Sequence, residues 1–119
     1  MAIDKSARNQ LESQVTIILG TASKTGEPNL APIALYWLRD ENAIIIGDMY
    51  LRTAKDNILE NPRAQVCFWD EANHKTFKFS GSVTYHTDGP EFDTAAEQFG
   101  LSGDTSDLKG VMVISLDQD

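Results

Sequence analysis

The chain has 119 residues, of which 41% are apolar and 24% are charged, as expected for one folded domain that spans residues 1–119. Its 18 Asp and Glu residues outnumber 10 Lys and Arg residues, which gives a net charge of −8. This balance argues against nucleic acid and against an anionic membrane surface as partners, because both are bound through Lys and Arg.

Two further features of the composition narrow the class of protein. No apolar run approaches the roughly 18 residues that cross a bilayer, and the first residues carry no apolar export signal. Cys67 is the only cysteine, so the chain has no internal disulfide and no thiolate metal cluster. We therefore expect a cytoplasmic protein.

The first two predicted elements are a helix and a buried strand. Residues 4–14 favour a helix, and Ile3, Ala7 and Leu11 fall on one face of it. Residues 15–22 are rich in β-branched side chains and are apolar on both faces, which predicts a buried strand. We expect the helix to lie over the core to which this strand belongs.

A predicted hairpin follows, and one proline interrupts it. A Gly-containing turn at residues 24–28 and an apolar run at residues 30–38 predict a second strand paired with the first. Pro32 lies inside this strand and cannot donate a ladder hydrogen bond, so we expect an edge, a bulge or a break there. A third strand is predicted at residues 43–46 and ends at Gly47-Asp48.

The middle of the chain predicts a short helix between two apolar strands. Thr53 with Asp56 three places later is typical of a capped helix start, and Asn61-Pro62 ends the helix because proline cannot continue it. Arg52 and Lys55 lie at the positive end of this helix. Free amides and two cations predict a phosphate site; the alternative is an ordinary capped surface helix, in which Asp56 opposes an anion.

Two further strands are predicted after this helix. Residues 65–69 form a short alternating strand, and residues 76–86 show the clearest period-two pattern of the chain, with Gly81 marking a bend. The two tryptophans of the chain are Trp37, in the predicted strand at residues 30–38, and Trp69, in the predicted strand at residues 65–69. They are predicted either to pack in the core or to form a flat wall beside a planar cofactor.

A third helix and a last strand complete the predicted fold. Phe92, Ala95 and Phe99 fall on one apolar stripe that follows Asp88-Gly89-Pro90, a typical helix start. Residues 111–116 form the last strand. About six strands in so short a chain predict a mainly β fold, a small antiparallel barrel with helices over its openings.

Several common kinds of site are not predicted. His74 and His86 lie twelve residues apart without metal-ligand spacing, so no metal site is expected. Cys67 on a strand is predicted to be a core residue rather than a nucleophile. The serines lack the glycine frame of a hydrolase, and the glycines form no phosphate loop or dinucleotide fingerprint. No side chain is committed to acid–base work, so no catalytic residue is predicted.

Three stretches and a short last strand together carry a resemblance to a known family. They are TIILGTASKTGEPNLAPIALYW, AIIIGDMYLRTAKDNILENPRAQVCFW and FKFSGSVTYHTDGPEF, which cover nearly all residues from Val15 onward. Their order resembles the FMN-binding split β-barrel proteins, the pyridoxamine 5′-phosphate oxidase-like family, and is most similar to its small FMN-binding members. The resemblance implies a mainly β fold, a six-stranded antiparallel split barrel of Greek-key type with helices packed on its openings.

The resemblance also implies a phosphate site for FMN. In that family a basic residue and a hydroxyl at the start of the central helix hold the phosphate, which here implies Arg52 and Thr53, with Lys55 and Asn57 beside them. Counted back from Ile58, the family's basic residue falls on Thr53, one place after Arg52. Either the turn is one residue longer here, or Lys55 takes the role.

The ring of the flavin lies in that family against the second and third strands. Here this implies contacts to Pro32, Ile33, Ala34, Gly47 and Asp48. The family is dimeric with the flavin at the subunit boundary, so the resemblance implies a homodimer. Trp69 and Lys78 are then candidate contacts from the partner chain.

The function implied is that of a small electron-transfer flavoprotein, in which FMN carries the redox chemistry. The acidic surround is expected to lower the flavin potential, and the redox partner is not identified by the sequence. A true pyridoxamine phosphate oxidase needs a second phosphate site, which the chain does not offer. Two alternatives are a flavin-dependent oxidase or reductase for a small substrate, and a non-FMN binding module on the same barrel, which has either lost FMN or holds haem or another flavin.

Overall fold

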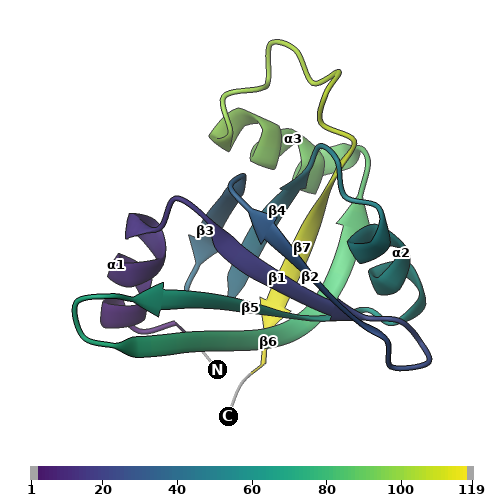
Figure 1. Cartoon of the computed structure of the whole chain (residues 1–119). Helices are drawn as coiled ribbons and strands as arrows, with labels where there is room; N and C mark the ends of the chain where they lie inside the picture. The colour runs from purple at the N-terminus through teal and green to yellow at the C-terminus, as the bar shows by residue number, and fades with distance from the viewer. Residues whose placement is uncertain (1–2, 118–119) are drawn as a thin grey trace.

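The computed structural model of the chain describes residues 3–117 and shows a curled antiparallel sheet with short helices packed on it (Figure 1). The helices are α1 (Lys5–Ser13), α2 (Thr53–Glu60) and α3 (Gly89–Gln98). The strands are β1 (Ile17–Ala22), β2 (Pro28–Ile33), β3 (Tyr36–Asp40), β4 (Ala43–Asp48), β5 (Arg63–Asp70), β6 (Lys75–His86) and β7 (Gly110–Leu116). Across the sheet their order is β2-β1-β5-β6-β7-β4-β3.

The predicted mainly β, antiparallel barrel-like fold is confirmed, but the predicted number of six strands is wrong. Residues 30–38 do not form one strand, because β2 ends at Ile33 and β3 begins at Tyr36. The first of these pairs with β1 and the second with β4, so the chain crosses between opposite edges of the sheet. Pro32 lies in the outermost strand β2, which is one of the places expected for it.

The long strand β6 connects the two halves of the sheet. Its first part pairs with β5, from Lys75 opposite Asp70 to Ser82 opposite Arg63, and its second part pairs with β7. Gly81 lies where the two pairings overlap, and it is buried. The bend expected at this glycine is therefore the point at which the strand changes its partner.

Two apolar clusters form the core, and β4 lies between them. The larger cluster lies inside the curled sheet and includes Ile44 and Ile46, whereas Ile45 belongs to a smaller cluster under α3. All six residues of β4 are buried. A strand buried on both faces reads as a continuous apolar run, as residues 43–46 do.

Helix α1 closes one opening of the curled sheet. Its N-terminus is capped by Asp4, whose carboxylate accepts a hydrogen bond from the Ala7 N–H at 2.8 Å. At its other end the Tyr36 hydroxyl of β3 donates to the Gln14 carbonyl oxygen at 2.6 Å, and the Gln14 side chain donates to the Trp69 carbonyl oxygen of β5 at 2.8 Å. The end of the helix thus joins two strands that are far apart in the sheet order.

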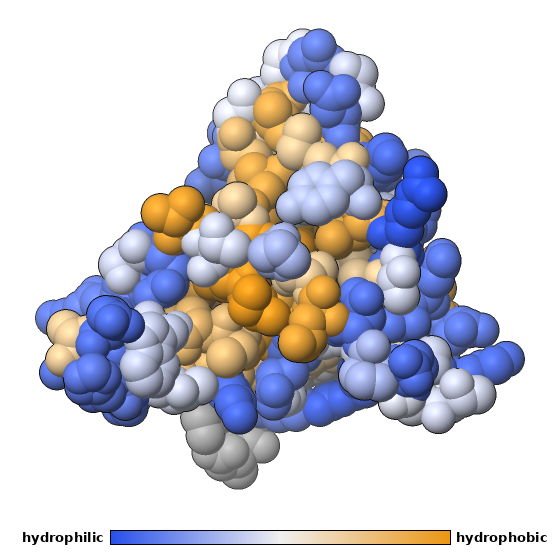
Figure 2. All heavy atoms as spheres, in the orientation of Figure 1, coloured by the Kyte–Doolittle hydropathy of each residue, from blue (hydrophilic) through white to orange (hydrophobic). Residues whose placement is uncertain are grey.

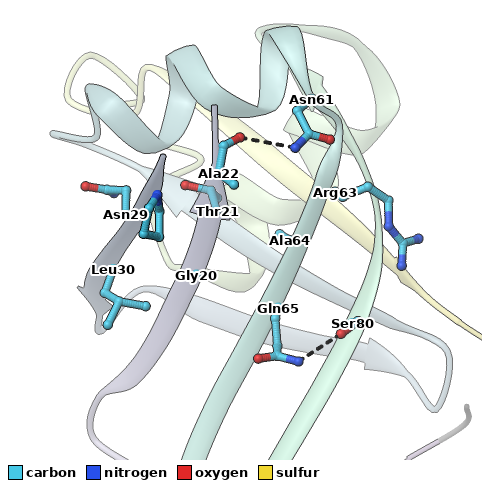
Figure 3. A pocket seen from close by; sticks show the side chains of 11 residues that line it. Gly20, Thr21, Ala22, Asn29, Leu30, Asn61, Arg63, Ala64, Gln65 and Ser80 are labelled. Carbon is cyan, nitrogen blue, oxygen red and sulfur yellow. Dashed lines mark hydrogen bonds between the residues drawn. The ribbon is translucent and has the colours of Figure 1, made fainter. Parts of the chain in front are cut away.

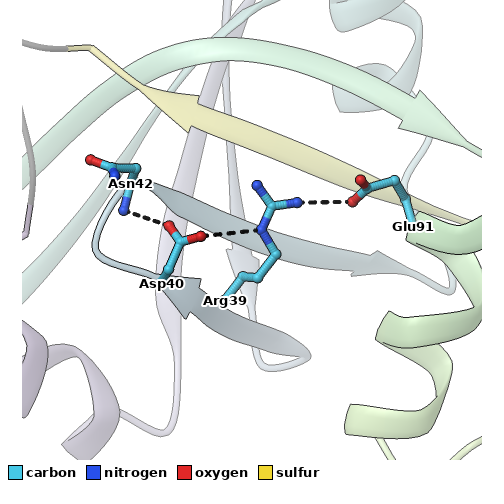
Figure 4. A network of polar contacts seen from close by, with 4 residues as sticks. All are labelled: Arg39, Asp40, Asn42 and Glu91. Atoms are coloured by element: carbon cyan, nitrogen blue, oxygen red, sulfur yellow. Dashed lines mark hydrogen bonds and ion pairs between the residues drawn. The ribbon is translucent and has the colours of Figure 1, made fainter.

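A surface network fastens α3 to β3 (Figure 4). The Arg39 guanidinium lies 3.0 Å from a carboxylate oxygen of Glu91 and 3.5 Å from one of Asp40. Asp40 in turn accepts a hydrogen bond from the Asn42 N–H at 2.8 Å. Exposed ion pairs of this kind contribute about 0–1 kcal/mol, so the apolar contacts beneath α3 hold it in place.

The pair of Arg63 and Asp117 predicts a pH effect near the C-terminal end of the sheet. Two hydrogen bonds, one of 2.8 Å, join the guanidinium to the carboxylate and hold the pKa of Asp117 below its ordinary value. Because the folded pKa is the lower one, this stabilisation is present above the unfolded pKa and is lost as the pH falls through the folded pKa.

We expect Arg63→Gln to raise the pKa of Asp117 toward its ordinary value, as measured by NMR titration of the side-chain carboxyl. Asp70 serves as the internal control, because its pKa is lowered chiefly by a hydrogen bond from the Asn73 side chain. An Asp117 titration that is unchanged in the variant would contradict the assignment.

None of the helices within residues 3–117 is long and apolar enough to cross a lipid bilayer.

Candidate functional site

Helix α2 begins without a side-chain cap. The residue before it, Arg52, offers its carbonyl oxygen to the Asp56 N–H at 2.9 Å, and no side chain of the described residues accepts from the first turn. The expected capping box of Thr53 and Asp56 is therefore wrong, because Thr53 is already the first helical residue. The first N–H groups of a helix have no partner within it, so these amides are available to a ligand.

The turn that leads into α2 is held by a buried carboxylate. Asp48 is 0% exposed at the end of β4, and its Oδ1 accepts a hydrogen bond from the Leu51 N–H at 2.8 Å. Its Oδ2 accepts from the Tyr85 hydroxyl of β6 at 2.7 Å. These two bonds fix the path of the chain between β4 and the first turn of α2.

The start of α2 borders a cleft of about 270 Å³ beside the edge strand β2. One wall comes from β2, and the other comes from the turn and the first residues of the helix. The lining residues are Asn29, Leu30, Ala31, Pro32, Tyr50, Leu51, Arg52, Thr53 and Ala54. The Tyr50 hydroxyl donates to the Pro32 carbonyl oxygen at 3.3 Å and joins the two walls.

Three of the predicted site residues meet at this cleft. Pro32, Arg52 and Thr53 all line it, and all three are exposed to solvent. Lys55 lies two residues after Thr53 along the helix, half-buried, with its ammonium 5.1 Å from the centre of the Tyr85 ring. The cleft therefore combines free helix amides, a hydroxyl and a guanidinium, with a second cation close by.

Other predicted site residues lie near the cleft but do not line it. Asn57 is buried one turn further along the helix, where its side chain donates to the Thr21 hydroxyl at 3.1 Å. Ile33 packs in the larger core cluster, and Ala34 is exposed in the connection between β2 and β3. Gly47 is buried in β4 and donates its N–H to the Leu35 carbonyl oxygen at 2.9 Å. Asp48, described above, is likewise enclosed by protein.

Trp69 and Lys78 lie away from the cleft of their own chain. Neither side chain is among those that line the cleft. Trp69 is 43% exposed, with its ring edge-on to His74. Lys78 is exposed on β6 and borders a different cleft of about 230 Å³, next to α1.

Sequence analysis missed several lining residues, of which Leu30 and Tyr50 are the most exposed. Their exposed fractions are 74% and 65%, which is unusual for large apolar side chains. Tyr50 had a usable signal, because it lies between an apolar strand and the proposed phosphate site, two residues before Arg52. Leu30 had none, because it lies in a strand that was expected to be apolar.

A second cleft (Figure 3) is larger, at about 380 Å³, but the side chains of Asn61, Gln65 and Arg63 that line it already have partners. It lies beside β1, β2 and β5. The Asn61 side chain donates to the Ala22 carbonyl oxygen at 3.3 Å, and the Gln65 side chain donates to the Ser80 hydroxyl at 3.0 Å. Arg63 is bound to Asp117. The start of α2 is therefore the better candidate site, despite the smaller volume beside it.

The Tyr85 hydroxyl stays protonated while it donates to Asp48. Burial of the ring, the hydrogen bond to Asp48 and the charge of that carboxylate all raise the pKa of Tyr85 far above its ordinary value. The phenol therefore keeps its proton throughout the neutral range.

Comparison with known proteins supplies a family for this fold. A family model described as pyridoxamine 5′-phosphate oxidase matches residues 3–118. HupZ of Group A Streptococcus has a similar structure, with a TM-score of 0.85 and 21% identity over 98% of this chain and 90% of that one.

Two other solved structures carry descriptions of what they bind or store. An FMN-binding protein of Syntrophomonas wolfei has a TM-score of 0.71 at 16% identity, over 94% of this chain and 80% of that one. HutZ of Vibrio cholerae, described as a haem storage protein, has a TM-score of 0.70 at 16% identity, over 100% and 93% of the two chains. At such low sequence identities, these structural similarities show a shared fold and nothing more.

Proposed function

Because the chain belongs to the pyridoxamine 5′-phosphate oxidase family, we propose that it binds FMN and acts as a small redox protein. The observation that carries the proposal is the uncapped start of α2, which faces a cleft lined by Arg52 and Thr53. A phosphate monoester needs several hydrogen-bond donors and positive charge, and this helix end offers both. Arg52 and Thr53 would hold the phosphate, with Lys55 adding charge nearby.

The remainder of the cofactor would extend along β2. Leu30, Pro32 and Tyr50 present apolar surface beside the phosphate end of the cleft. Tyr50 can offer a ring face to a planar group, and its hydroxyl is already tied to the edge strand. Bound FMN supplies hydride or electron transfer; the protein's part is to bind it, to orient it and to limit the access of water.

We propose that the working unit is a homodimer with the flavin at the subunit boundary. The cleft of one chain, at about 270 Å³, lies just below the roughly 300–1,000 Å³ that enclose a typical small ligand. Apolar residues also gather in the middle of one face of the molecule, with polar residues toward its corners (Figure 2). A second copy would complete the cleft and could bring Trp69 or Lys78 to it.

A haem-binding role is the second candidate, and the likeness to the haem storage protein HutZ is the observation in its favour. Haem needs an axial ligand, most often histidine. His74 is exposed in the turn after β5, and the His86 Nε2 lies 2.8 Å from the Thr84 hydroxyl. Neither histidine lines the cleft at α2, so the site favours FMN.

The proposal is tested by adding FMN, riboflavin or haem separately to purified protein and recording absorption spectra and fluorescence. We expect FMN to bind and its fluorescence to change, with riboflavin binding much more weakly because it lacks the phosphate. Tight haem binding with no affinity for FMN would overturn the proposal. Size-exclusion chromatography with light scattering reports whether the FMN complex is a dimer.

We expect Arg52→Ala combined with Lys55→Ala to weaken FMN binding by roughly 10- to 100-fold, because hydrogen bonds to charged groups contribute about 1.5–3 kcal/mol. Riboflavin binding should be nearly unchanged. The matched control combines Arg8→Ala with Lys24→Ala, which removes the same positive charge from exposed surface pairs on Glu12 and Glu60. Equal losses of FMN affinity in the two double variants would show only a general charge effect.

A further inference from the structure

Asp48 stands out because its carboxyl group is buried and no Lys or Arg side chain within residues 3–117 hydrogen-bonds to it. It ends a strand of isoleucines and is 0% exposed, and burial of a carboxylate is costly unless donors replace water. The Leu51 N–H and the Tyr85 hydroxyl are those donors, and the Lys109 N–H bonds to its carbonyl oxygen at 2.8 Å. Asp48 is thus fixed to three separate parts of the chain.

The bond from Asp48 to Leu51 determines how the helix begins. Leu51 is buried, whereas its neighbours Tyr50 and Arg52 are exposed and line the cleft. A turn pinned at Leu51 therefore sets the positions of the residues on both sides of it. The first N–H groups of α2 follow directly after this turn, so the turn sets their positions as well.

Tyr85 reaches this turn because the opposite strand leaves space for its ring. A side chain at Gly110 would overlap the phenol, because its first carbon would fall closest to the Cζ and the hydroxyl oxygen of Tyr85. Lys55 also lies over this ring, with its ammonium 5.1 Å from the ring centre, within cation–π range. One side chain of β6 thus touches both the carboxylate that holds the turn and a cation of α2.

We infer that Asp48 and Tyr85 are positioning residues that set the phosphate end of the cleft, Asp48 through the Leu51 amide and Tyr85 through Asp48 and Lys55. The inference rests on the proposed function. Asp48 was expected to contact the flavin ring. In this inference it acts instead at the phosphate end of the cofactor. Neither residue needs to contact the ligand.

The test compares Tyr85→Phe with Tyr36→Phe, in which the same hydroxyl is lost from a tyrosine of similar burial. Tyr36 donates to the Leu11 and Gln14 carbonyl oxygens at the end of α1, away from the cleft. The measured quantity is the ratio of the Kd for riboflavin to the Kd for FMN, which isolates the contribution of the phosphate. We expect this ratio to fall about tenfold in Tyr85→Phe and to stay at the wild-type value in Tyr36→Phe.

A second readout uses the protein without ligand. Hydrogen exchange at the Leu51 amide should accelerate in Tyr85→Phe and stay unchanged in Tyr36→Phe, because only the former loosens the acceptor of that amide. Asp48→Asn keeps an acceptor for the Leu51 N–H. Its ratio of the Kd for riboflavin to the Kd for FMN should therefore stay closer to the wild-type value than the ratio of Asp48→Ala.

The outcomes separate the inference from the function on which it rests. A wild-type protein with no affinity for FMN overturns the proposed function and the inference with it. Wild-type binding of FMN with an unchanged ratio in Tyr85→Phe overturns the inference and leaves the function standing. An equal fall of the ratio in both phenylalanine variants also overturns it, since the effect would then be a general loss of stability.

Discussion

Gly81→Ala is expected to destabilise the protein by about 3 kcal/mol, at the upper end of the cost of overpacking a core. Gly81 is the residue of β6 that pairs with Ala64 on one side and Leu116 on the other. A carbon added there would overlap the Ser115 carbonyl oxygen and lie 3.0 Å from the Ile114 Cγ2. The first of these neighbours is backbone of the adjacent strand, so it cannot rotate away.

Thermal and urea unfolding would measure this loss, which corresponds to a fall in Tm of roughly 10 °C for a domain of this size. Gly103→Ala is the matched control, because a carbon added at Gly103 meets nothing within 4 Å. The control should unfold close to the wild type. If Gly81→Ala also unfolds at the same temperature as the wild type, β6 and β7 must move apart more easily than the structure indicates.

Ile44→Ala should be similarly severe, with an expected loss of about 2–5 kcal/mol, because it deletes buried methyl and methylene groups and leaves a cavity. Ile44 is 0% exposed in the larger core cluster, on a strand that is buried on both faces. The measurement is again the free energy of unfolding in urea.

Leu59→Ala provides the comparison for Ile44→Ala, since Leu59 is 61% exposed on α2. A surface truncation of this kind changes stability by about 0.5 kcal/mol or less. A small loss for Ile44→Ala, or a large one for Leu59→Ala, would be inconsistent with the described core.

Much of the fold could be predicted from local patterns. The alternation of residues 76–86 and the continuous apolar run of residues 43–46 identified β6 and β4, because side-chain period and burial are linked directly. The division of residues 30–38 into two strands could not be predicted. Ala34 and Leu35 carry no turn signal, and the break arises because β3 pairs with β4 rather than with β1.

The candidate site was predictable in place but not in detail. A basic residue before a short helix between two apolar strands pointed to the start of α2, where Arg52 and Thr53 do border a cleft. The cap was predicted wrongly because Thr53 entered the helix instead of preceding it. The burial of Asp48 depends on Tyr85, 37 residues away, and no local pattern contains such a contact.

The two prolines of β2 affect how the protein behaves when it is concentrated. Pro28 and Pro32 lie four residues apart in the outermost strand, so their missing N–H groups fall on the same side of that strand. Proline is tolerated in a sheet where its nitrogen faces away from the ladder, which places these gaps on the open edge. A foreign strand would find two donors absent there, so stacking into fibrils through this edge is disfavoured.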